Sequence, residues 1–329
     1  MQDAPNLFDT PLKGLKKKEW LQEVATIASE HGTYYALDKR HAAVLIEPEE
    51  IPQGETTLLV TFETLQGIQT LSDHGQPLGW DMVRALNWSH LSVISDGDTW
   101  FRTQGVYGFF DRMIDDGFFE EFDNVVFYGA GPCGYAACAF SVASPGATVL
   151  AVQPQATLDP RVTEWDDRFV EMRRLDFTSR YGYAPDMLDA AMQAFVIYDP
   201  SEQLDAMHAA LFTRPNVTKL RTRRLGNAIQ SDLVEMQLLY RLLARAGTGK
   251  LTEAAFAKLW RKRRDHPPYL RKVLATLDAA GRPYLSTLLC RNVTARMRAP
   301  RIQRRLDALL KSAADGKFTA PPPLAGGAE

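Results

Sequence analysis

Cysteine is scarce in this 329-residue chain: it has three, Cys133, Cys138 and Cys290, too few to suggest a disulfide framework. No paired Cys/His spacing of the kind that holds zinc accompanies them, so no metal site is predicted. The N-terminus shows no signal-peptide pattern, and no apolar run approaches ~18 residues, the length that a membrane span needs. These absences predict a cytoplasmic protein without a membrane span.

Net charge is also small, −2, but it is unevenly distributed along the chain. Residues 241–311 contain eighteen Lys/Arg and four Asp/Glu, a charge of +14, which leaves −16 for the remainder. Such an asymmetry suggests an acidic partner for the basic part. We expect a homo-oligomer or an acidic protein surface. A nucleic-acid surface and an anionic glycan or lipid surface are alternatives, although the aromatic array that many nucleic-acid binders add is missing.

Short apolar runs alternate with helical patterns over much of the chain, which predicts an α/β fold with a mostly parallel sheet flanked by helices. Strands are predicted at 33–37, 42–46, 57–62, 91–94, 125–128, 148–152, 195–198 and 217–222. Helices are predicted at about 13–30, 106–116, 132–143, 203–212 and 232–245. A long loop is expected after residue 62, running through Gly75-Gln76-Pro77.

The C-terminal part has a different composition, which predicts a helical appendage. Thr252 is typical of a helix N-cap, and Pro268, Pro283 and Pro300 suit helix starts. We therefore predict three parts: an α/β domain over 1–247, a basic helical appendage over 248–313 and a disordered tail over 314–329. Within the first part, residues 161–193 are predicted to form a largely helical cap insertion.

The central motif follows the apolar run Val125–Tyr128 and has two competing interpretations. Gly129, Gly131 and Gly134 match G-x-G-x-x-G after a strand and before a helix, which is the pattern of an NAD or FAD site in an oxidoreductase. Against this, the next strand ends at Gln153, where such a site needs an acid for the ribose. This fingerprint also usually opens its domain, whereas strands precede it here.

The helix that starts at Pro132 supports other chemistry. Its N-terminus presents N–H groups and a positive dipole, so residues 129–134, with Ala130 among them, are a candidate site for phosphate, sulfate or carboxylate. Cys133 lies in the first helical turn, where a thiol pKa is lowered, and is a candidate nucleophile for a hydrolase or acyltransferase. The alternative is that Cys133 is a small buried residue. Of the histidines considered, His208 is expected on a helix face, and His74 and His90 near loops.

The stretch YGAGPCGYAACAFSVASPGATVLAVQPQATLDP resembles a family of bacterial α/β-hydrolase-like proteins that carry a Ser-x-Gly-Gly-Tyr-Ala-Ala nucleophile elbow. The resemblance covers roughly residues 30–245 and implies an α/β-hydrolase-type sheet. Gly131 occupies the nucleophile position, Cys133 the position of the glycine two residues later, and Asn227 that of the histidine. Asp199 remains at the position of the acid, although an acid at a strand end is also commonly paired with an arginine.

The resemblance therefore implies a degenerate member, a pseudoenzyme without the attacking serine or the general base. Loss of one triad member alone costs several orders of magnitude in rate. We predict a non-catalytic or repurposed protein that binds a small anion or ligand at Gly129–Gly134 and Asn227 and needs no cofactor. The oxidoreductase and the Cys133 enzyme are the alternatives. A phosphosulfate reductase-like enzyme is a remote one, because its Ser-Gly-Gly-x-Asp-Ser and Glu-Cys-Gly motifs are absent.

Overall fold

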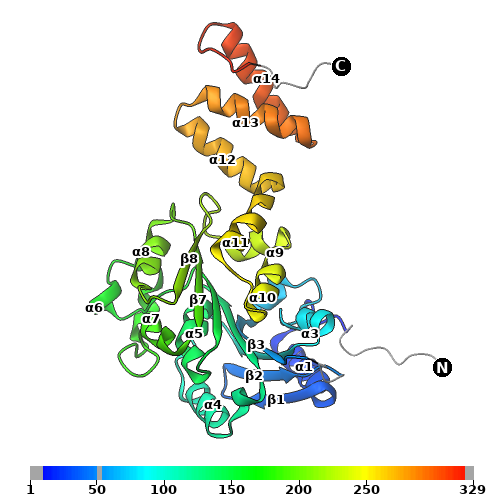
Figure 1. The fold of residues 1–329 in the computed structure, drawn as a ribbon, viewed down its shortest axis with the longest axis vertical. Helices are drawn as coiled ribbons and strands as arrows, with labels where there is room; N and C mark the ends of the chain where they lie inside the picture. Colours follow the sequence, from blue (N-terminus) through cyan, green and yellow to red (C-terminus); the bar gives the residue numbers. More distant parts are fainter. Residues whose placement is uncertain (1–9, 50–53, 323–329) are drawn as a thin grey trace, which may run out of the picture. The chain divides into compact units, whose positions relative to one another are not determined.

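Eight strands form one sheet in the computed structural model, which describes residues 10–49 and 54–322. Their spatial order is β1-β2-β4-β3-β5-β6-β7-β8 (Figure 1). The β1–β2 and β2–β4 pairs are antiparallel, and all the other pairs are parallel. The strands are β1 Gly32–Ala36, β2 His41–Ile46, β3 Thr57–Thr64, β4 Ser89–Ser95, β5 Asn124–Ala130, β6 Thr148–Val152, β7 Gln193–Tyr198 and β8 Val217–Arg221.

The mostly parallel sheet with helices on its faces confirms the predicted α/β-hydrolase-type fold. All eight predicted strands are present, and β6 has the predicted bounds. Apolar runs located these strands well because a strand buried on both faces needs apolar side chains at nearly every position. In β2 that requirement is visible: Ala43 and Leu45 belong to one hydrophobic cluster, and Val44 and Ile46 to another.

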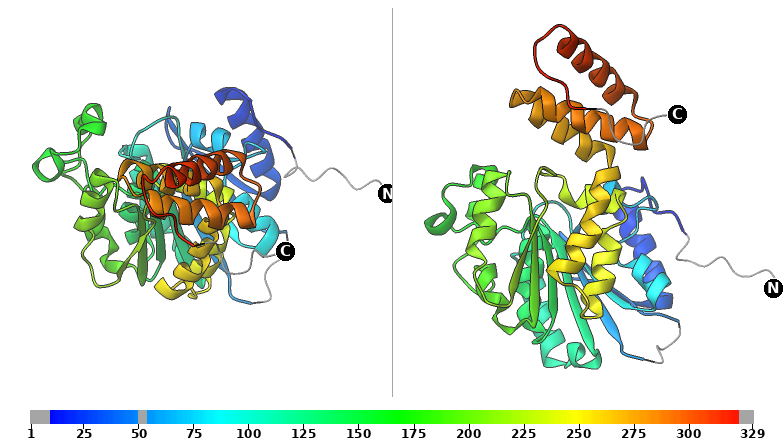
Figure 2. Two further views of the ribbon diagram at one scale, coloured as in Figure 1. Left: turned by 90° about the horizontal axis from the view of Figure 1, so that it is seen from above. Right: turned by 45° about the horizontal axis from the view of Figure 1, so that its top comes forward.

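Helices cover both faces of the sheet in the first unit (Figures 1 and 2). The larger cluster includes side chains of α4 (Gln104–Asp115), α5 (Pro132–Phe140) and α8 (Gln203–Leu211). The smaller cluster includes α1 (Lys17–His31) and α3 (Trp80–Leu86). The single-turn helices η2 Phe118–Glu121 and η3 Ser141–Ala143 follow α4 and α5.

Two predictions about connections are wrong. The long loop expected after residue 62 instead contains α2 (Leu65–Leu71) and α3, because the Thr64 side chain caps α2 directly at the end of β3 by accepting from Gly67 N. The single helix expected at 232–245 is two helices, α9 (Ile229–Glu235) and α10 (Leu239–Gly247). Gln237 between them has a φ of 54°, which ends helical geometry.

The predicted cap consists of short helical turns between β6 and β7 rather than long helices. They are α6 Pro160–Thr163, η4 Asp167–Arg174, α7 Ala184–Met187 and η5 Leu188–Ala190. Among the described residues, no helix is long and apolar enough to cross a membrane.

The chain divides into two units, Met1–Lys258 and Leu259–Glu329, whereas the sequence suggested a division at residue 248. α11 (Glu253–Trp260) spans this division, and Thr252 caps it by accepting from Ala255 N. The second unit contains η6 Arg261–Asp265, α12 Pro267–Ala279, α13 Pro283–Arg296 and α14 Pro300–Ala314, packed around an apolar core. Of the predicted disordered tail, residues 323–329 lie outside the described residues, and Arg291 binds the carbonyls of Pro321 and Pro322.

Candidate functional site at the strand-to-helix turn

Gly131 forms the sharp turn between β5 and α5 and has the backbone shape of a nucleophile elbow. Its φ of 57° and ψ of −125° are angles that residues with a side chain rarely adopt. Its N–H donates to Val152 O at 2.8 Å, which holds the turn against β6. A Cβ at this position would meet no atom within 4 Å. The elbow is therefore present, with open space where the attacking side chain of a hydrolase would stand.

The other two glycines of the motif are explained by close packing of the backbone. A Cβ on Gly129 would lie 2.1 Å from Cys133 O, and one on Gly134 would lie 3.1 Å from Val152 O. Two further observations do not fit an NAD or FAD site. Four strands precede β5 in the chain, whereas this fingerprint usually opens its domain. Gln153 follows β6, where such a site needs an acid, and it donates to Asp205 at 2.6 Å. The helix–strand contact thus accounts for Gly129 and Gly134 without a pyrophosphate.

Pro132 removes a further part of hydrolase chemistry. In α/β-hydrolases the N–H of the residue after the nucleophile helps to bind the oxyanion. That residue is Pro132 in this chain, and proline has no N–H. Sequence reasoning treated Pro132 as a helix start and as part of the candidate anion site, although its position beside Gly131 already indicated the missing N–H. The turn therefore lacks this N–H as well as an attacking group.

Cys133 is a small buried residue, which is one of the two alternatives predicted for it, rather than an activated thiol. Its side chain is 7% exposed and belongs to the larger hydrophobic cluster. Burial raises the pKa of the Cys133 thiol, and the negative charges of Glu63 and Asp98 raise it further. Burial outweighs the effect of the helix N-terminus, so the thiol stays protonated and is not an activated nucleophile.

Asp199 is buried at the end of β7 and pairs with backbone N–H groups rather than with the expected arginine. Ser201 N donates to Oδ1 at 2.8 Å, and Gly226 N donates to Oδ2 at 2.7 Å. The second bond ties the segment after β8 to the end of β7. Since that segment continues into Asn227, the Asp199 carboxylate positions the loop that carries Asn227.

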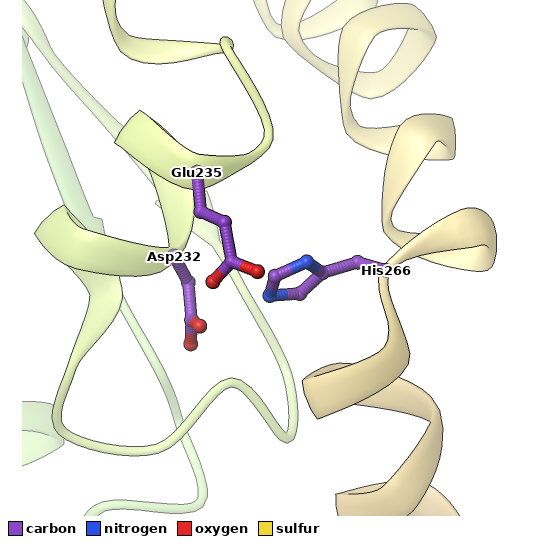
Figure 3. Close-up of side chains that lie close together, drawn as sticks. All are labelled: Asp232, Glu235 and His266. Atoms are coloured by element: carbon purple, nitrogen blue, oxygen red, sulfur yellow. The ribbon is translucent and has the colours of Figure 1, made fainter.

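A cavity of about 280 Å³ opens over the elbow and brings some of the predicted site residues together. Ala130, Gly131, Pro132 and Asn227 line it. The other lining residues come from the segment after β6, from the cap, from α8 and from the start of α9: Gln153, Gln155, Arg168, Phe169, Asp205, Ala228, Gln230 and Ser231. Gly129, Cys133, Gly134 and Asp199 do not line it. Asp232 and Glu235 of α9 do not line this cavity either. Figure 3 draws these two side chains together with His266, which precedes α12 in the second unit.

The one guanidinium in the lining of this cavity is held by two carboxylates. Arg168 donates to Asp205 at 2.6 Å and to Asp166 at 2.8 Å. Burial works against ionisation of Asp166, but hydrogen bonds from His208 and Arg168 outweigh it and hold the Asp166 pKa well below its usual range. Most of the positive charge of Arg168 is therefore neutralised before a ligand arrives.

His208 lies in α8, as predicted, and it is fully buried. Ala156 N donates to its Nδ1 at 3.1 Å, which leaves the ring proton on Nε2, 2.8 Å from Asp166 Oδ2. This pair anchors the cap segment to α8 and gives the elbow no general base. His90 is buried as the second residue of β4, near the connection from α3, and burial lowers its pKa to about 3.

Comparisons with protein-family models and with curated protein sequences gave no match. Solved structures show distant similarity. Est1E from Butyrivibrio proteoclasticus is 11% identical over 65% of this chain and 98% of its own, with a TM-score of 0.42. An S-formylglutathione hydrolase from Agrobacterium tumefaciens is 9% identical over 63% of this chain and 89% of its own, with a TM-score of 0.42. A thermostable esterase from Pseudomonas putida is 13% identical over 73% of this chain and 90% of its own, with a TM-score of 0.40. Similarity at this level establishes neither an activity nor a substrate for this chain.

Proposed function

We propose that the first unit is a non-catalytic ligand-binding protein built on an α/β-hydrolase-type fold. The observation that carries the proposal is the elbow itself: Gly131 has its backbone angles, but no side chain fills the space in front of it. The lack of an N–H at Pro132, the burial of Cys133 and the replacement of histidine by Asn227 support it. Each of these removes a separate part of acyl-transfer chemistry.

The group that binds at the turn is a small oxygen acceptor such as a carboxylate or phosphate. The positive end of the α5 dipole lies at the cavity, because Pro132, the first residue of this nine-residue helix, lines it, although Pro132 has no N–H to donate. The side-chain amides of Gln153, Gln155, Asn227 and Gln230 line the cavity and supply further donors. Asp205 lies in the same lining, but its two oxygens accept from Arg168 and Gln153, so the cavity suits an anion of low charge better than a polyanion.

Replacing Gly131 by valine is expected to abolish stabilisation of the protein by acetate, phosphate or sulfate. The valine side chain would fill the open space at the turn and block access to α5. Thermal unfolding measured with and without each anion tests this. Gly249→Val is the matched control, because Gly249 also has a positive φ, 64°, and open space around its missing Cβ, but it does not line the cavity.

The proposal predicts that the wild type and Gly249→Val melt at higher temperature with the anion, and that Gly131→Val does not. An equal shift in all three proteins would remove the turn as the site. Ester hydrolysis above the buffer rate that is lost in Gly131→Val would contradict the non-catalytic assignment.

We propose separately that the second unit binds a second copy of this chain. Residues 259–329 carry fifteen Lys/Arg and five Asp/Glu, whereas the rest of the chain has a net charge of −12. Four exposed arginines, Arg271, Arg298, Arg301 and Arg304, line a cavity of about 400 Å³ whose lining includes no carboxylate. Other arginines of this unit are paired, as Arg305 is with Asp278. Unpaired guanidinium groups around an apolar hollow suit an acidic protein surface.

Reversing two of these charges with Arg301→Glu/Arg304→Glu is expected to weaken self-association by at least about tenfold at low salt. Lys311→Glu/Lys317→Glu makes the same change in net charge elsewhere in the unit and is expected to have a much smaller effect. Light scattering at low and high salt measures the association. A wild type that is monomeric at low salt would exclude the second copy as the partner.

A further inference from the structure

A cavity of about 410 Å³ opens beside the end of α4, next to η2 and the turn between η3 and β6. Its two charged lining residues, Glu120 and Asp123, are both acidic, and we call this cavity the acidic hollow. Most of its other lining residues are apolar, among them Met113, Ile114, Phe119 and Phe122. None of them lines the elbow cavity, so the first unit has a hollow that the elbow does not use.

Apolar side chains are left uncovered at the acidic hollow. Ile114, in its lining, is 44% exposed, and Met192 is 66% exposed. Met192 lies beside the hollow, because its N–H donates to the carbonyl of the lining residue Ala147 at 3.0 Å. Exposed apolar side chains next to an apolar cavity, with a polar rim, are typical of a surface that binds another protein.

Carboxylates crowd the segments that form this hollow. Residues 115–123 contain five Asp/Glu and no Lys or Arg. Glu55 joins them, because the side-chain amide of Asn124 donates to its carboxylate at 3.3 Å. Among the described residues, none of these six exposed carboxylates forms an ion pair, and Arg112, the one cation of α4, does not pair with them. The six are Glu55, Asp115, Asp116, Glu120, Glu121 and Asp123.

Several other carboxylates of the first unit are neutralised by an arginine. Asp111 pairs with Arg180 at 2.7 Å, and Asp186 and Asp189 pair with Arg214 at 2.7 and 2.9 Å. The acidic hollow has no such partner, and the negative end of the α4 dipole adds to its charge, since α4 ends at Asp115. Its negative potential is therefore available to a cationic surface.

The second unit offers a surface of matching chemistry, which we call the arginine hollow. It is the cavity of about 400 Å³ lined by Arg271, Arg298, Arg301 and Arg304. Met297 and Ile302 add apolar surface to the same lining. An exposed side chain such as Ile114 can enter this cavity while the guanidinium groups around it reach the neighbouring carboxylates. An apolar centre with charge-assisted hydrogen bonds at its rim is the usual anatomy of a protein interface.

We propose that the acidic hollow of one copy binds the arginine hollow of a second copy, with Ile114 at the centre and Asp115 and Glu120 among the carboxylates that meet the arginines. This inference rests on the self-association proposed above and assigns the surface that receives the arginine hollow. Because the two surfaces differ, each copy presents one of each kind. Two copies can then bind reciprocally, or further copies can add at the free ends.

Reversing two of these charges with Asp115→Arg/Glu120→Arg is expected to weaken self-association at least about tenfold at low salt. Neither side chain forms a hydrogen bond within the described chain, and a cation at the end of α4 suits the helix dipole, so the variant is expected to fold. Glu23→Arg/Glu30→Arg is the matched control, because it makes the same change in net charge on exposed positions of α1. Light scattering at low and high salt measures the association.

Combining the charge reversals on both surfaces in one chain gives the sharper test. Asp115→Arg/Glu120→Arg together with Arg301→Glu/Arg304→Glu restores opposite charges across the contact, so association is expected to return to within about threefold of the wild type. Ile114→Ser is an independent variant without a charge change. It is expected to weaken association several-fold at low and at high salt, because salt does not screen an apolar contact.

The outcomes separate this inference from the self-association on which it rests. If Arg301→Glu/Arg304→Glu weakens association but Asp115→Arg/Glu120→Arg does not, the arginine hollow binds another acidic surface and the inference is wrong, although self-association stands. A combined variant that stays as weak as either pair alone would also overturn it. A wild type that is monomeric at low salt would remove both.

Discussion

Replacing Asp199 by alanine is expected to destabilise the first unit by about 2–5 kcal/mol, because two buried backbone N–H groups would lose their acceptor. Ser201 N and Gly226 N donate to the two carboxylate oxygens, and alanine supplies no substitute. Asp199→Asn keeps one acceptor oxygen and is expected to lose roughly half as much. Urea unfolding followed by tryptophan fluorescence measures this, since five of the six tryptophans belong to the first unit.

Asp123→Ala is the matched control for this prediction. Asp123 also accepts a backbone N–H, from Thr56 at 2.8 Å, but its side chain is exposed and water can replace it. A loss below about 1 kcal/mol is therefore expected there. If Asp199→Ala were as stable as Asp123→Ala, the structural role that we assign to Asp199 would be wrong, and a role in ligand chemistry would have to be reconsidered.

Replacing Gly129 by alanine is expected to destabilise the protein by at least about 3 kcal/mol. The new Cβ would lie 2.1 Å from Cys133 O, a backbone atom of α5 that cannot move without displacing the helix. Gly131→Ala is expected to cost less, about 1–3 kcal/mol, because its Cβ meets no atom and only the backbone angles are strained. Urea unfolding of both variants measures the difference.

Gly108→Ala controls for the general effect of removing a glycine. Gly108 lies within α4 and a Cβ there meets no atom, so alanine is expected to stabilise the helix by up to about 1 kcal/mol. A Gly129→Ala variant as stable as Gly108→Ala would contradict the packing explanation of this motif. A cofactor-binding role for Gly129 would then have to be considered again.

Local patterns in the sequence predicted the sheet well but not the environment of the site. The apolar runs located the inner strands, since a strand buried on both faces carries its signal in consecutive residues. The edge strands β1 and β8 were also located, although most of their residues are partly buried or exposed. α2 was missed because a short helix depends on a capping contact such as Thr64 with Gly67 rather than on a long periodic pattern. Cys133 was misjudged for a different reason: a thiol pKa depends on burial and on charges from distant segments, such as Glu63.

The sequence by itself determined which chemical groups are missing from the turn, since the identities of Gly131, Pro132 and Asn227 remove an attacking group, an N–H donor and a base in any conformation. Only the tertiary structure decided what the remaining groups do. It buried Cys133 and tied Asp199 to two backbone N–H groups. The reason is physical: residue identity limits which bonds a side chain can make, whereas its protonation and its partners depend on residues far away in the chain.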